Sequence, residues 1–133
     1  MNQSNNDFWL NLDRLVTSCN LRVDRPKGTP HPRYQSFIYP LDYGHLEDTR
    51  SGDGEGIDVW LGSLPVRKVT AIICSLDLEK RDSEIKILLG CTVQETQDIL
   101  RVHNTGLQSA ILLPRFDSEI DAQSFVESGN QGE

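Results

Sequence analysis

The stretch Ser51-Gly-Asp-Gly-Glu-Gly-Ile-Asp-Val59 sets three acids among three glycines, directly before a short strand-like run. The acids are Asp53, Glu55 and Asp58. Glycine lets a backbone turn tightly, so these carboxylates are able to converge on one point. Hard cations such as Mg²⁺ bind carboxylate oxygens and water. The stretch therefore predicts a divalent-cation site, and the alternative that its spacing leaves open is a solvated acidic turn.

Aromatic and basic residues precede this acidic stretch. Tyr39 and Tyr43 stand four positions apart in Tyr39-Pro-Leu-Asp-Tyr43-Gly. Their hydroxyls are suited to hydrogen-bonding phosphate oxygens, and the alternative is that the two rings only pack together. An earlier loop carries Arg25, Lys27 and Arg33, which either meet an anion or keep the surface soluble. Carboxylates for a cation and basic groups for an anion are the mixture that a metal-bound anion needs.

The acidic stretch resembles the signature of the soluble (family I type) inorganic pyrophosphatases, Asp-Gly-Asp-Pro-hydrophobic-Asp-hydrophobic. This sequence reads Asp-Gly-Glu-Gly-Ile-Asp-Val over residues 53–59. Three more motifs occur in the family's order, and they are Val23-Asp-Arg-Pro-Lys-Gly28, Arg33-Tyr34 and Tyr39-Pro-Leu-Asp-Tyr-Gly44. The resemblance covers roughly residues 20 to 90, and four motifs in order make it specific.

The resemblance implies a role for each matching residue. The implied metal ligands are Asp53, Asp58, Glu79 and Glu84, with Asp24 supporting them. The implied catalytic residues are Glu55, which would hold or deprotonate the attacking water, and Tyr43. The implied phosphate-binding residues are Arg33, Lys86 and Tyr39. The implied activity is hydrolysis of diphosphate to two phosphates with Mg²⁺, or with Mn²⁺ as an alternative.

Several positions depart from the family pattern. Glu55, Glu79 and Glu84 are each one methylene longer than the family's aspartates, and Gly56 replaces a proline. The family's arginine hairpin after Tyr34 is missing, as are its late Tyr-Lys pair and its long C-terminal helix. Two alternatives to diphosphate hydrolysis therefore stay open. One is a non-catalytic protein that binds metal and phosphate, and the other is a hydrolase of another phosphoanhydride.

The hydrophobic pattern predicts an α+β, mainly β fold. The expected strands span 21–24, 34–39, 57–61, 69–78, 85–89 and 107–113, and residues 40–56 are expected to form a long loop. The expected helices begin at Asp7, begin after a Thr92–Glu95 capping box, and span 118–127. Short strands at this spacing predict a small antiparallel β-barrel with peripheral helices, and the resemblance implies the OB-like pyrophosphatase barrel.

Length and composition predict one domain over residues 1–133, with residues 1–6 and 128–133 as flexible tails. The net charge of -7 argues against nucleic acid as a partner, because that binding needs clustered basic residues. No apolar run is long enough for a bilayer and no secretory signal is evident, so we expect a cytoplasmic protein with no membrane partner. The cysteines are expected to be reduced thiols. The expected partner is small-molecule diphosphate, and the resemblance suggests a homo-oligomer.

Overall fold

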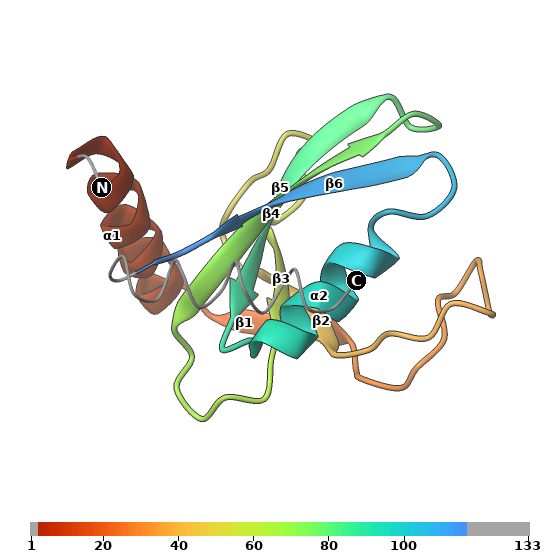
Figure 1. Cartoon of the computed structure of the whole chain (residues 1–133), viewed down its shortest axis with the longest axis horizontal. Helices are drawn as coiled ribbons and strands as arrows, with labels where there is room; N and C mark the ends of the chain where they lie inside the picture. The colour runs from red at the N-terminus through yellow and green to blue at the C-terminus, as the bar shows by residue number, and fades with distance from the viewer. Residues whose placement is uncertain (1–2, 117–133) are drawn as a thin grey trace.

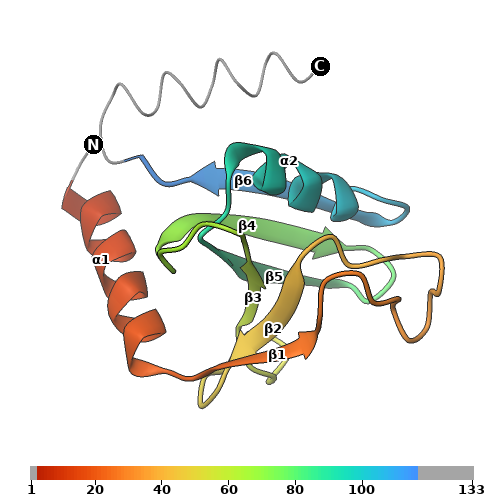
Figure 2. The same cartoon turned by 90° about the horizontal axis from the view of Figure 1, so that it is seen from below.

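A computed structural model describes residues 3–116 as a six-stranded mixed sheet with two helices packed against it (Figures 1 and 2). The helices are α1 (Gln3–Ser18) and α2 (Val93–Val102). The strands are β1 (Leu21–Arg25), β2 (Asp42–Leu46), β3 (Asp58–Leu61), β4 (Val69–Asp77), β5 (Asp82–Leu89) and β6 (Gln108–Pro114). Their order across the sheet is β1-β2-β3-β5-β4-β6, and neighbours are antiparallel except for β3 and β5.

Each face of the sheet carries its own core, because side chains alternate along the strands. On one face, Trp60, Ile73 and Leu88 are at most 1% exposed and pack with Ile99 of α2. On the other face, Val59 and its neighbours pack with Trp9 and further residues of α1. The two helices therefore cover opposite faces, and the middle of the sheet is buried on both sides.

The mainly-β prediction is confirmed, but the sheet is open and mixed instead of a closed antiparallel barrel. The end strands β1 and β6 do not pair with each other in the described chain. The chain passes from β3 to β4 by way of residues 62–68, and β4 then turns back into β5. That return places β5 between β3 and β4, and parallel to β3. Hydrophobic periodicity alone does not specify this arrangement.

The predicted strand over residues 34–39 is wrong. This segment lies in a loop whose backbone bonds are local, such as Tyr39 N–H to the Thr29 carbonyl at 3.0 Å, with one isolated bridge between Pro30 and Ile38. Pro30 and Pro32 lack N–H groups for a sheet ladder. The aromatic residues of this segment therefore pack on one another instead of joining the sheet.

The predicted loop over residues 40–56 is also wrong in part, because β2 forms inside it. The largest boundary differences are at α1, which begins at Gln3 and not at Asp7, and at β5, which begins at Asp82 and not at residue 85. The capping box is confirmed, because Thr92 and Glu95 exchange both bonds. The helix predicted over 118–127 and the tail over 128–133 lie outside the described residues. Neither described helix is long and apolar enough to cross a membrane.

We predict that Gly44→Ala destabilises the protein by about 2 kcal/mol. A methyl group at Gly44 would overlap the backbone carbonyl of Arg22, which is the approach that pairs β1 with β2. Gly52→Ala is the matched control, because the nearest atom to its added methyl group is 3.8 Å away. Urea unfolding measures both variants, and equal midpoints for the two would contradict the prediction.

Candidate active site

A buried lysine lies at the centre of the predicted site. Lys86 is 5% exposed, and its Nζ donates to Tyr43 Oη at 2.8 Å, Asp58 Oδ2 at 2.7 Å and Glu84 Oε2 at 3.0 Å. Alternation along β5 puts Glu84 and Lys86 on one face of the sheet. The parallel pairing of β3 with β5 brings Asp58 alongside, and β2 supplies Tyr43. Three strands therefore contribute to one cluster of four side chains.

The ionisation states of this cluster follow from burial and neighbouring charge. Burial alone would lower the pKa of the Lys86 ammonium, but the Tyr43 oxygen and the Asp58 carboxylate raise it above its ordinary value. Burial raises the pKa of the Tyr43 phenol, which therefore stays neutral. The cluster accordingly holds a charged ammonium, paired with Asp58 and Glu84, beside a neutral hydroxyl.

Asp53 and Glu84 form a carboxyl–carboxyl pair at the edge of this cluster. The hydrogen bond from Glu84 lowers the pKa of Asp53 to about 2, and the Ser51 hydroxyl, 2.6 Å from Asp53 Oδ1, assists. Burial raises the pKa of Glu84, and the bond to Asp53 raises it further, although Lys86 opposes this change. The bond between the two carboxyl groups therefore favours ionisation of Asp53 over ionisation of Glu84.

The donor chemistry of this carboxyl pair fits a divalent cation. Carboxylate oxygens are the ligands that Mg²⁺ prefers, and cation binding displaces protons from them. Within residues 3–116, no group of three or more His, Cys, Asp or Glu side chains is arranged to hold a metal ion. Lys86 lies between Asp58 and Glu84, so Asp53 and Glu84 are the residues that would hold the cation, with Asp58 beside them.

The remaining acids of the predicted site lie apart from Lys86. Glu55 is exposed, and its backbone closes the 51–55 turn through a 2.7 Å bond from Ser51 N–H to its carbonyl. Glu79 is exposed in the turn between β4 and β5, where its N–H donates to Asp77. Neither carboxylate is bonded to the cluster in the described structure.

Asp24 and His45 form a pair that sequence reasoning missed. Asp24 Oδ2 lies 2.7 Å from His45 Nδ1, and His45 is the cross-strand partner of Asp58. The sequence assigned His45 to a loop because β2 was not recognised. His45 of this pair therefore lies on the strand next to Asp58.

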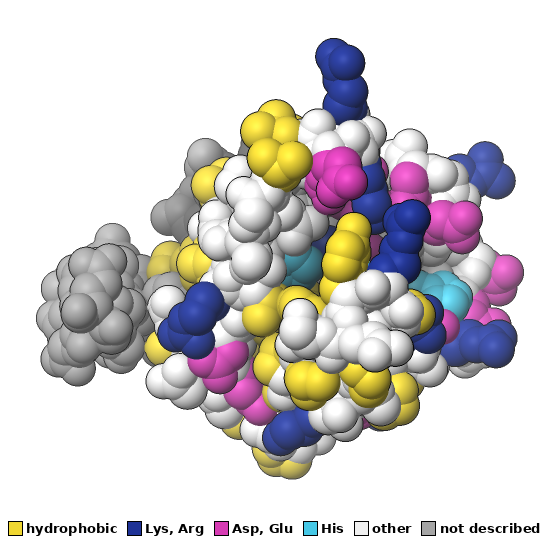
Figure 3. Space-filling model, turned by 90° about the vertical axis from the view of Figure 1, so that its right-hand side faces the viewer, with side chains coloured by type: hydrophobic (Ala, Val, Ile, Leu, Met, Phe, Trp, Pro, Cys, Tyr) yellow, Lys and Arg dark blue, Asp and Glu magenta, His cyan; other side chains and the backbone are white. Residues whose placement is uncertain are grey.

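The loop before β2 carries the other two predicted phosphate-binding residues. Arg33 is exposed, whereas Tyr39 is 7% exposed within an aromatic core. Tyr39 is hydrogen-bonded to Arg25, and its burial is the main cause that raises its pKa. This side of the molecule is recessed near its centre, and acidic, basic and hydrophobic side chains surround the recess (Figure 3).

Behind the cluster, Trp60 holds a buried histidine in one tautomer. The indole N–H of Trp60 donates to His103 Nε2 at 3.0 Å, so His103 Nδ1 carries the proton and faces Gln108 Oε1 at 3.1 Å. The ring of Trp60 packs against Tyr43 with centroids 4.6 Å apart. This chain of contacts fixes the position of the Tyr43 ring from within the core.

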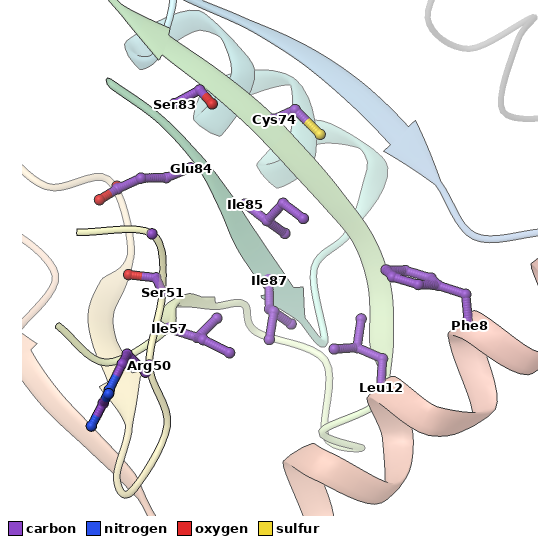
Figure 4. A pocket seen from close by; sticks show the side chains of 11 residues that line it. Phe8, Leu12, Arg50, Ser51, Ile57, Cys74, Ser83, Glu84, Ile85 and Ile87 are labelled. Carbon is purple, nitrogen blue, oxygen red and sulfur yellow. The ribbon is translucent and has the colours of Figure 1, made fainter. Parts of the chain in front are cut away.

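A pocket of about 490 Å³ opens on the opposite face, between α1 and the sheet (Figure 4). Its lining is mainly apolar, with Phe8 and Leu12 from α1 facing Ile85 and Ile87 of β5. Glu84 also borders this pocket. Glu84 therefore borders both this apolar cavity and the polar cluster around Lys86.

Two solved structures share this fold. The first is an inorganic pyrophosphatase from Neisseria gonorrhoeae, with a TM-score of 0.56 and 15% identity, over 80% of this chain and 88% of that one. The second is an inorganic pyrophosphatase from Coxiella burnetii, with a TM-score of 0.52 and 14% identity, over 81% of this chain and 90% of that one. No known protein-family profile and no curated protein match the sequence. The chain therefore has a pyrophosphatase-like fold, and identities this low show the fold alone.

We predict that Lys86→Met destabilises the protein by about 3 kcal/mol, because it leaves Asp58 and Glu84 without their buried counter-charge. Lys80→Met, in the exposed turn, should change stability by less than about 0.5 kcal/mol. Adding Asp58→Asn to Lys86→Met should restore part of the loss. Urea unfolding measures all three proteins, and a double variant no more stable than Lys86→Met would argue against the charge pairing.

We predict that His103 makes the protein less stable in acid. Burial lowers the pKa of folded His103 from 6.5 to about 4, so between these values only the unfolded chain takes up the proton. The free energy of unfolding should therefore fall as pH drops through this range, by about 1.4 kcal/mol per pH unit. Urea unfolding of His103→Gln over the same pH range should lack this part of the decrease in the free energy of unfolding. Identical slopes in the two proteins would show that His103 does not titrate in this way.

Proposed function

We propose that the protein hydrolyses inorganic diphosphate with the aid of Mg²⁺ at the Lys86 cluster. The observation that carries the proposal is the buried ammonium held by Tyr43, Asp58 and Glu84, with Asp53 bonded to Glu84. Such a site offers N–H and O–H donors to a phosphate and carboxylate oxygens to a cation. The pyrophosphatase-like fold supports the proposal.

In this mechanism the chain's own groups bind and orient the substrate. Lys86 exchanges one of its three present acceptors for a phosphate oxygen, and Tyr43 donates its phenolic proton to the same anion. Arg33, from the exposed loop, adds a second positive charge. Glu55 accepts a proton from the attacking water, and Asp58 holds Lys86 in place. A bound divalent cation supplies further charge neutralisation and acidifies water, which is the main source of catalysis in phosphoryl transfer.

One observation favours a second candidate, a protein that binds metal and phosphate without turnover. Lys86 already neutralises Asp58 and Glu84, at 2.7 Å and 3.0 Å. Carboxylates that are paired with an ammonium hold a cation less strongly than unpaired ones. On this view the cluster binds its ligand but lacks the full positive charge that hydrolysis requires. Binding of diphosphate without phosphate release would identify this candidate.

The test measures phosphate release from pyrophosphate with Mg²⁺ present. Asp53→Ala and Asp58→Ala should each lower the rate by about 100-fold, because either loss displaces groups around the substrate. Each should also weaken Mg²⁺ binding by about tenfold in calorimetry. Asp98→Ala removes a carboxylate that binds Arg101 on α2 and is the matched control. Near-normal release and Mg²⁺ affinity in either site variant would refute the assignment of the site.

A further inference from the structure

A continuous row of aromatic rings leads from the protein surface to Lys86. The ring centroids of Tyr34 and His31 lie 5.2 Å apart, and His31 stacks on Tyr39 at 6.1 Å with an interplanar angle of 10°. Tyr39 in turn lies 5.7 Å from Tyr43, whose hydroxyl accepts from Lys86. The outer ring, Tyr34, is 56% exposed. The row therefore has one end at the cluster and the other in solvent.

The inner part of this row is explained by packing alone, but the outer ring is not. The loop does not pair with the sheet, so Phe37 and Tyr39 serve as its hydrophobic core. Tyr34 adds little to that core, because more than half of the residue remains open to water. An exposed aromatic ring is a group on which a planar ligand group stacks.

Positive charges accompany the same row. The pKa of His31 is lowered first by burial and then by the charges of Arg25, Lys80 and Arg33, so these three groups come near the ring from two different segments. Arg25 ends β1, Arg33 belongs to the loop that follows, and Lys80 belongs to the β4–β5 turn. The His31 ring is consequently neutral at pH 7. The row thus combines neutral rings for stacking with cations for an anionic ligand.

We infer that the site binds a nucleoside diphosphate, with the base stacked on Tyr34 and His31 and the terminal phosphate at Lys86. This inference rests on the proposed function. Inorganic diphosphate has no group that uses an exposed ring, whereas every nucleobase has a π face. In the reaction, the water oxygen bonds to the terminal phosphorus and the bridging P–O bond breaks. The bridging oxygen leaves with the nucleoside monophosphate, and the proton of water passes to Glu55.

The experiment compares ADP and pyrophosphate as ligands of the full chain by calorimetry with Mg²⁺. Tyr34→Ala should weaken ADP binding by about tenfold and leave pyrophosphate binding unchanged, because only ADP carries a ring to stack. Tyr34→Phe keeps the ring and should bind ADP as the wild type does. Both variants keep the backbone bonds of Tyr34, and circular dichroism checks their folding.

The outcomes separate this inference from the proposed function. A wild-type protein that binds and hydrolyses pyrophosphate but does not bind ADP overturns the inference alone. Equal effects of Tyr34→Ala on the two ligands, or no effect on ADP, also overturn it. Selective loss of ADP binding in Tyr34→Ala supports it, even where pyrophosphate is not hydrolysed. A wild-type protein that binds neither ligand overturns both proposals.

Discussion

The ammonium of Lys86 is the group on which the rest of the site depends. A buried charge is tolerated only when it is paired and hydrogen-bonded, and here Tyr43, Asp58 and Glu84 provide three partners. These partners come from β2, β3 and β5, so satisfying one charge fixes the relative positions of three strands. Glu84 also bonds to Asp53, and this bond holds the glycine-rich 51–56 turn against the sheet.

The sequence predicted the residue types of the site better than their arrangement. Asp58 and Lys86 stand on segments whose apolar alternation is strong, and both were correctly placed on strands. Tyr43 was assigned to a loop, because residues 40–56 contain four glycines and five acids. In the structure Gly44 serves a close strand approach instead. That distinction depends on the neighbouring strand, which a local pattern does not contain.

The sheet topology and the aromatic loop were also mispredicted because local patterns do not show which segments become neighbours. Residues 34–39 have strand-like composition, yet the prolines at 30 and 32 leave them without a ladder to join. The parallel contact of β3 with β5 is set by where the β4–β5 hairpin docks, and no motif in either strand encodes it. Glu79 and Glu55 illustrate the consequence for the site, since each occupies the matching sequence position but faces solvent.

The parallel junction between β3 and β5 also governs the order in which the chain can assemble. The β2–β3 and β4–β5 pairs are each formed by strands adjacent in sequence, so each is able to form early as a local unit. Asp58 belongs to the first unit and Lys86 to the second, and they meet only when the units dock. The cost of removing the ammonium from water therefore falls on that docking step. A chain halted before it would possess both hairpins and still lack the Lys86 cluster, so an assembled cluster reports that the two units have docked.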